Sequence, residues 1–122
     1  MTNGSGTRAA MDPTADPKKV TVWITPGATL NDPPTVSPAT PITLYVKSSP
    51  KNPKKIKWEC TDSNAKFNVE FRSGTPFDQS DYGNTNSESS EPRHGCAEKT
   101  PYKYSVSVNG GTPLDPDVII DR

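Results

Sequence analysis

Residues 102–108 constrain the fold of this chain most, because large apolar side chains alternate along them with serine and lysine. The apolar side of the run is made of two tyrosines and two valines. A period of two is the pattern of a half-buried β-strand with one face toward solvent. The Asn-Gly-Gly sequence at 109–111 then indicates a tight turn. We therefore expect a strand at 102–108 and a second, closing strand at about 117–121.

Four further runs have the same alternating character and end at proline, glycine or polar turns. We expect a strand at each of them: 20–24, 42–46, 56–60 and 66–72. Val36 stands between prolines and is expected in a short edge segment. The 14 prolines and 8 glycines exclude long helices and are typical of an all-β domain with many turns. The sequence therefore predicts an all-β fold, a Greek-key β-sandwich of about seven strands.

The length of 122 residues corresponds to one domain. Residues 1–18 are rich in Gly, Ser, Thr, Asp and Pro without periodicity, which predicts a disordered leader, and residues 19–122 are expected to form the single β-sandwich. Within it, residues 73–100 predict a long polar loop whose beginning docks through Pro76 and Phe77. Loops of this length in compact domains are usually functional or disordered.

The charge balance and the apolar pattern exclude several classes of function. The formal net charge is zero, which gives no electrostatic support for binding nucleic acid or an anionic membrane. No apolar run approaches 18 residues, so we expect no membrane span, and the N-terminus lacks the apolar core of a secretory signal. We expect a monomer.

A group of lysines lies in and around residues 49–55, and counting Lys47 there are four of them. They form either a basic patch for an acidic partner or a solvated loop that keeps neighbouring strand edges soluble. No aromatic residue interleaves them, as single-stranded nucleic acid would require, so we expect the solvated loop.

Cys60 and Cys96 are the only two cysteines, and we expect a disulfide between them, which would stabilise a thin core by roughly 4 kcal/mol. Two unpaired thiols and a metal or redox pair are the alternatives. The bridge would imply an oxidising compartment, so an exported or periplasmic location is expected only if it forms. His94 is the only histidine and lies in a polar segment, where a solvent-exposed side chain is the usual outcome.

The order of these elements resembles the cupredoxin-like β-sandwich, and with it the Ig-like domains of uncharacterised bacterial proteins. The elements that carry the resemblance are an N-terminal strand, a Trp-bearing middle strand, Phe-x-Val-x-Phe at 67–71, a long variable loop, Tyr-x-Tyr-x-Val at 102–106 and a closing strand. The resemblance covers roughly residues 19–122 and implies the fold more than an activity.

The copper ligands that the resemblance would imply are absent from this sequence. Copper-binding members place a cysteine at the end of the Tyr-x-Tyr/Phe strand, where this chain has Val106, and neither histidine nor methionine occurs in residues 107–116. A blue-copper site needs two imidazoles and a thiolate. We therefore expect the fold without a metal or other cofactor. An atypical copper or redox protein that uses Cys60, Cys96 and His94 is the alternative.

No convergent set of catalytic residues is recognisable, so we expect a non-catalytic module with a binding or structural role. Trp23 and Tyr45 fall opposite the aliphatic stripes of their strands and form the candidate binding face. An exposed aromatic on a sandwich face can contact a carbohydrate or a protein. The long loop, at 73–96, is the other candidate contact surface.

Overall fold

The computed structural model describes residues 17–39 and 41–122. This part of the chain contains nine short strands and no helix. The prediction of an all-β fold is confirmed. Most of the expected N-terminal leader lies outside the described residues. The strands are β1 Lys19–Thr25, β2 Thr35–Ser37, β3 Ile42–Tyr45, β4 Lys55–Cys60, β5 Phe67–Glu70, β6 Asp81–Gly83, β7 Pro101–Lys103, β8 Ser105–Val108 and β9 Asp117–Asp121.

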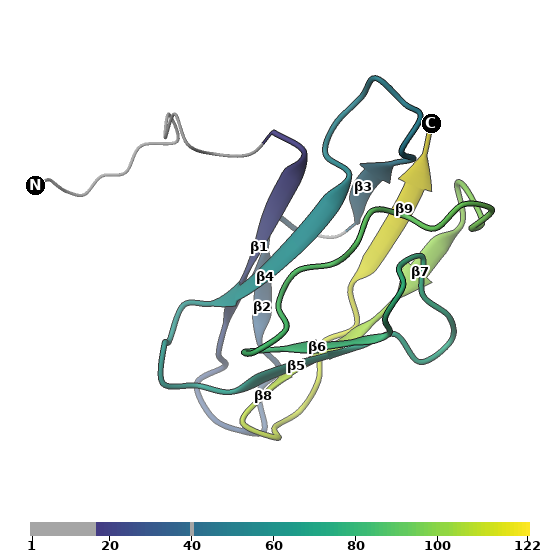
Figure 1. Cartoon of the computed structure of the whole chain (residues 1–122). Coiled ribbons are helices and arrows are strands. Elements are labelled where there is room, and N and C mark those ends of the chain that lie inside the picture. The colour runs from purple at the N-terminus through teal and green to yellow at the C-terminus, as the bar shows by residue number, and fades with distance from the viewer. Residues whose placement is uncertain (1–16, 40) are drawn as a thin grey trace, which may run out of the picture.

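The strands form three small sheets, with the orders β2-β1-β4, β3-β9-β7 and β6-β5-β8. Figure 1 shows the first two sheets side by side, with the third crossing the lower part of the view. Two pairs are parallel, β1 with β4 and β3 with β9, and the other pairs are antiparallel. Because parallel strands need a crossover connection, the chain is not a simple meander of hairpins.

The expected strand at 102–108 is divided in two at Tyr104, the corner beyond which pairing with β5 is added. The antiparallel pairing with the closing segment continues past this corner, because Val106 forms a bridge with Leu114. β7 pairs with β9, whereas β8 pairs with β5. The alternation is as predicted, because Tyr104 and the valines of β8 are buried. At the corner the Tyr104 N–H donates to the Pro116 carbonyl at 3.0 Å, but proline has no N–H to return the bond. The ladder is interrupted there, and two strands result.

Trp58 of β4 is fully buried and lies at the centre of the core. Its ring centroid is 4.7 Å from that of Tyr82, 5.7 Å from Tyr104, 6.2 Å from Phe71 and 6.5 Å from Phe77. Tilted and edge-to-face pairs of this kind contribute about 0.5–1.5 kcal/mol each beyond their buried area. Burial raises the pKa of Tyr104 to about 12, so its hydroxyl stays protonated at neutral pH.

The segment 73–100 is more ordered than the sequence predicts. Pro76 and Phe77 are fully buried, as expected for the docked beginning of the segment. The segment also contains β6, and it adds backbone hydrogen bonds to β4. The backbone N–H of Trp58 donates to the Ser87 carbonyl, and the backbone N–H of Ser89 donates to the Ile56 carbonyl, each at 2.8 Å. Residues 76–89 therefore close the core beside β4 and are not a free loop.

The expectation that the lysine-rich segment is wholly solvated is wrong for Lys54, because only 6% of the surface of this residue is exposed. Its ammonium group donates three hydrogen bonds to backbone carbonyls, at 2.9 Å to Val46, 2.6 Å to Ser49 and 3.1 Å to Lys51. An ammonium has three donors, so all of them are used. Lys54 therefore fixes the connection between β3 and β4.

Replacing Lys54 with methionine keeps most of the side-chain stem and removes the three donors. We expect the free energy of unfolding to fall by about 2–4 kcal/mol, because hydrogen bonds to a charged group are lost at a buried position. Urea denaturation measures the change. Lys47→Met is the control, since Lys47 is exposed and its replacement should change stability by less than about 0.5 kcal/mol. Equal stabilities of the two variants would contradict the assignment.

Phe77→Ala tests whether the segment 73–100 belongs to the core. We expect a loss of about 3–5 kcal/mol, the usual cost of truncating a buried phenylalanine. Thr85→Ala, at an exposed position of the same segment, should stay within about 0.5 kcal/mol of the parent. A Phe77→Ala protein as stable as the parent in thermal and urea unfolding would show that the segment is not part of the core.

Candidate functional site

Trp23 is an exposed aromatic residue on the central strand of the β2-β1-β4 sheet, with 44% of its surface exposed. Its neighbours Val22 and Ile24 are fully buried, so the alternation of the strand turns the indole outward. Trp23 pairs in register with Ser37 of β2 and with Glu59 of β4. The indole is therefore flanked on both sides by polar side chains.

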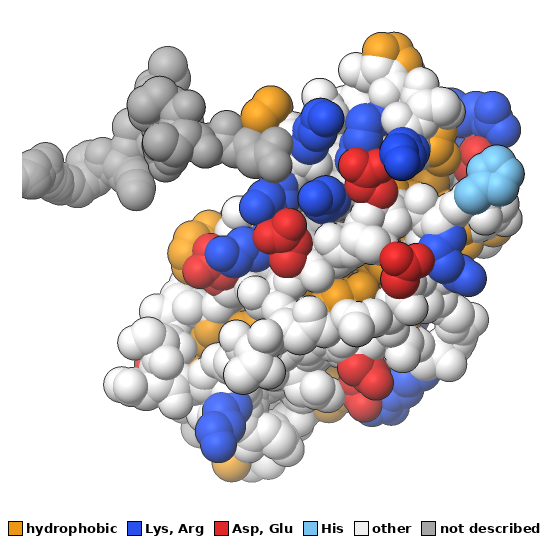
Figure 2. Space-filling view, viewed as in Figure 1, with side chains coloured by type: hydrophobic (Ala, Val, Ile, Leu, Met, Phe, Trp, Pro, Cys, Tyr) orange, Lys and Arg blue, Asp and Glu red, His pale blue; other side chains and the backbone are white. Residues whose placement is uncertain are grey.

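The residues that alternate outward with Trp23 form a polar surface, which we call the Trp23 face. Its charges are largely paired. Lys57 lies 4.0 Å from Glu59, and at the edge of the sheet Glu88 is 3.0 Å from Lys19 and 3.9 Å from Lys55. Figure 2 shows lysine and acidic side chains interleaved along this edge of the sheet. The Trp23 face consists of Thr21, Trp23, Thr25, Thr35, Ser37, Lys57 and Glu59.

Tyr45, the other aromatic of the candidate face, belongs to a different sheet. It lies on β3 opposite Asp121 of β9 and is half-buried. The Lys51 ammonium lies 5.6 Å from the centre of its ring, a distance typical of a cation–π contact. The structure therefore pairs Trp23 and Tyr45 with different strands and does not join them in one strand-paired surface.

The structure corrects the expected disulfide, because Cys60 and Cys96 are both free thiols. Cys96 lines the same groove as Val46. The Val46 carbonyl accepts a hydrogen bond from Lys54, the residue just before β4, so this groove lies near the start of β4. Cys60 is at the opposite end of β4, roughly 17 Å from its start at about 3.3 Å per residue. A disulfide requires Cα atoms about 4.4–6.8 Å apart, so these two cysteines cannot be bridged in this fold.

His94 and Cys96 line one groove, but Cys60 does not. The three proposed copper or redox ligands are therefore not brought together. Among the described residues, no three His, Cys, Asp or Glu side chains gather in a way that could hold a metal ion. Burial raises the pKa of the Cys96 thiol, more than the charge of nearby Arg93 lowers it, and Glu98 acts in the same direction as burial. Cys96 is therefore a weak nucleophile at neutral pH.

Sequence reasoning placed Trp23 but missed the residues around it. Ser37 and Glu59 become its neighbours only through strand pairing, and the pairing of β1 with β4 joins residues 36 positions apart in the sequence. The alternation of residues 56–60 already predicted that Glu59 points away from the core. No feature of the sequence indicated which strand would lie beside it.

A scan against protein-family models and searches of curated proteins and of solved structures found no match to this chain. Among the described residues, no helix has the length and apolar character needed to cross a membrane.

The free thiols can be counted by alkylation. We expect iodoacetamide without reductant to add two groups to the native protein, with Cys96 reacting slowly at neutral pH and faster as the pH rises, because its raised pKa limits the thiolate. Intact mass spectrometry measures the additions. The same protein alkylated in denaturant gives the reference count of two. A mass two hydrogens lower, with no addition even in denaturant, would show that Cys60 and Cys96 form a disulfide.

Proposed function

We propose that this chain is a non-catalytic module of the cupredoxin-like Greek-key type, and that its Trp23 face binds a neutral carbohydrate chain. The observation that carries the proposal is a half-exposed indole on the central strand of a sheet, between hydroxyl and carboxylate side chains. An indole offers a flat apolar surface for the C–H face of a sugar, and the flanking groups can hydrogen-bond its hydroxyls.

The position of Trp23 distinguishes it from an ordinary exposed apolar residue, which would need no explanation. Because β1 is paired with a strand on each side, the backbone that carries the indole is held in place. On either side the pairing supplies Ser37 and Glu59, and Thr21 and Thr25 lie two residues away along β1. A ligand chain lying across the three strands would therefore meet one stacking platform and several hydrogen-bonding groups.

A carbohydrate fits this face better than a protein does. Trp23 and Leu30 are the exposed large hydrophobic residues of the described chain, and stable protein interfaces usually bury a cluster of such residues. The charges of the face are paired, as between Lys57 and Glu59, and give no net field for a charged partner. A neutral, polyhydroxylated ligand needs neither an apolar cluster nor a net field.

The alternative of an atypical copper or redox protein has less support. It requires Cys60, Cys96 and His94 to share one metal or one electron-transfer site, and the geometry keeps Cys60 at the far end of β4. The position that the cupredoxin resemblance assigns to a cysteine ligand is Val106, which is fully buried in the core. We therefore propose no metal or other cofactor for this module.

Affinity electrophoresis in gels that contain a soluble β-glucan, a mannan or a xylan tests the proposal. We expect at least one of these to retard the protein, and we expect Trp23→Ala to weaken the binding about tenfold or more because the stacking surface is lost. Leu30→Ser is the matched control: Leu30 is 59% exposed, and it lies outside the Trp23 face.

Tryptophan fluorescence provides a second readout. The chain has two tryptophans, and Trp58 is fully buried, so a ligand-induced change in emission reports on Trp23. The change should disappear in Trp23→Phe. No retardation by any of the three polysaccharides, or equal retardation of the Trp23→Ala variant, would overturn the proposal.

A further inference from the structure

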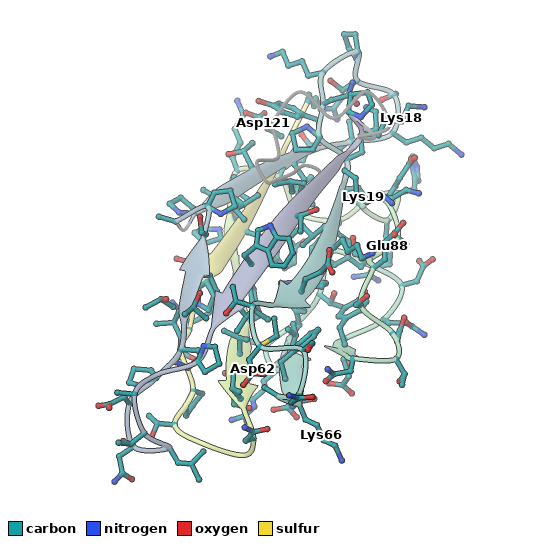
Figure 3. All side chains as sticks on the ribbon, turned by 90° about the vertical axis from the view of Figure 1, so that its left-hand side faces the viewer. Lys18, Lys19, Asp62, Lys66, Glu88 and Asp121 are labelled. Atoms are coloured by element: carbon teal, nitrogen blue, oxygen red, sulfur yellow. The ribbon has the colours of Figure 1, made fainter. Side chains whose placement is uncertain are left out.

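A groove of about 610 Å³ opens at the end of the molecule opposite the 109–111 turn, away from the Trp23 residue itself. Its walls are the two segments 46–48 and 92–98, together with Arg122 after β9. The segments meet where β3 and β9 end side by side, and there the Val46 N–H donates to the Asp121 carbonyl at 3.0 Å. Asp121 marks this end in Figure 3, and Lys66 marks the opposite one. The volume is in the usual range for sites of small molecules.

The groove carries positive charge that its own acidic residue does not balance. Arg122 is paired with Glu98 through an Nε–Oε1 contact of 2.8 Å, so these two charges neutralise each other. Arg93 donates one N–H to the Thr75 carbonyl, which is uncharged, and a guanidinium has four further donors. Lys47 and His94 are exposed and have no hydrogen-bond or ion-pair partner among the described residues. Lys47 and Arg93 are therefore cations without a counter-charge at the groove.

The groove also has an apolar side. Val46 and Cys96 pack against the hydrophobic core, and Pro92 is buried beside them. Because burial raises the pKa of the Cys96 thiol, this side chain stays neutral and does not repel an anion. The site therefore combines an apolar wall with cations at its rim.

Several hydrogen bonds hold the wall 92–98 in place. The backbone N–H of Arg93 donates to the Pro76 carbonyl at 2.7 Å, and the backbone N–H of Ala97 donates to the Tyr102 hydroxyl at 2.7 Å. A wall fixed before binding lowers the entropic cost of taking up a ligand. These bonds distinguish the groove from a gap between free loops.

We propose that this groove binds a small organic anion, a carboxylate joined to an apolar ring or chain. The carboxylate lies between Lys47 and the free donors of Arg93, and the apolar part lies against Val46, Pro92 and Cys96. His94, at the mouth, lies beside the bound ligand. This site is independent of the Trp23 face, and either can fail without the other.

Because His94 is the only histidine in the chain, the NMR signals of its imidazole report on the groove at fixed pH. The probes are phenylacetate and its neutral analogue phenylacetamide, with inorganic phosphate as an anion that has no apolar part. We expect phenylacetate to shift the imidazole signals in a saturable way, and to do so less strongly as salt is added. Phosphate should bind more weakly, and phenylacetamide should give no saturable shift.

Lys47→Glu should weaken phenylacetate binding about tenfold or more, and Lys47→Gln should have an intermediate effect. Lys66→Glu makes the same change of charge at an exposed position at the other end of the molecule and should leave the affinity unchanged. The proposal is overturned by equal shifts with phenylacetamide, by an equal effect of Lys66→Glu, or by no saturable shift with phenylacetate up to roughly 20 mM. A dissociation constant of that size corresponds to a binding free energy of about 2.3 kcal/mol.

Discussion

The packing of four aromatic rings around the indole of Trp58 is the interaction on which the rest of the structure depends. The rings come from separate parts of the chain: Phe71 follows β5, Phe77 begins the long polar segment, Tyr82 lies in β6, and Tyr104 marks the corner between β7 and β8. Phe71 also contacts Phe77 and Tyr104, with centroids 5.7 Å and 5.0 Å apart. One cluster therefore joins elements of all three sheets, which individually have only three short strands.

The same cluster determines which side chains remain available for function. Because Trp58 points inward from β4, its neighbours Lys57 and Glu59 must point outward, and the parallel register places Glu59 beside Trp23. A shift of this register by one residue would bury the lysine and the glutamate and expose the core. Which positions of β1, β2 and β4 form the Trp23 face is thus a consequence of how the core fixes the register.

The sequence predicts the parts of this fold that depend on local alternation. Most of the expected strands lie close to observed ones, and the inward positions of Trp58, Phe67 and Val69 agree with their burial. The sequence could not show that Tyr104 is a corner, since the cause is its pairing with Pro116, the residue before β9. It also could not show that Cys60 and Cys96 are far apart, because their separation depends on Cys96 lining a groove with Val46, near the start of β4, while Cys60 ends that strand. The Greek-key, cupredoxin-like ordering remains a prediction.

Lys47 and Lys54 illustrate why a charged segment cannot be interpreted from composition alone. They are seven positions apart in one lysine-rich connection, yet Lys54 is buried with all three donors bonded to carbonyls and Lys47 is exposed beside a groove. The three hydrogen bonds of the Lys54 ammonium group give this residue a structural role. By fixing the backbone at Val46 and Ser49, Lys54 also fixes the wall from which Lys47 projects. The burial of Lys54 and the exposure of Lys47 therefore leave only the Lys47 charge at the groove.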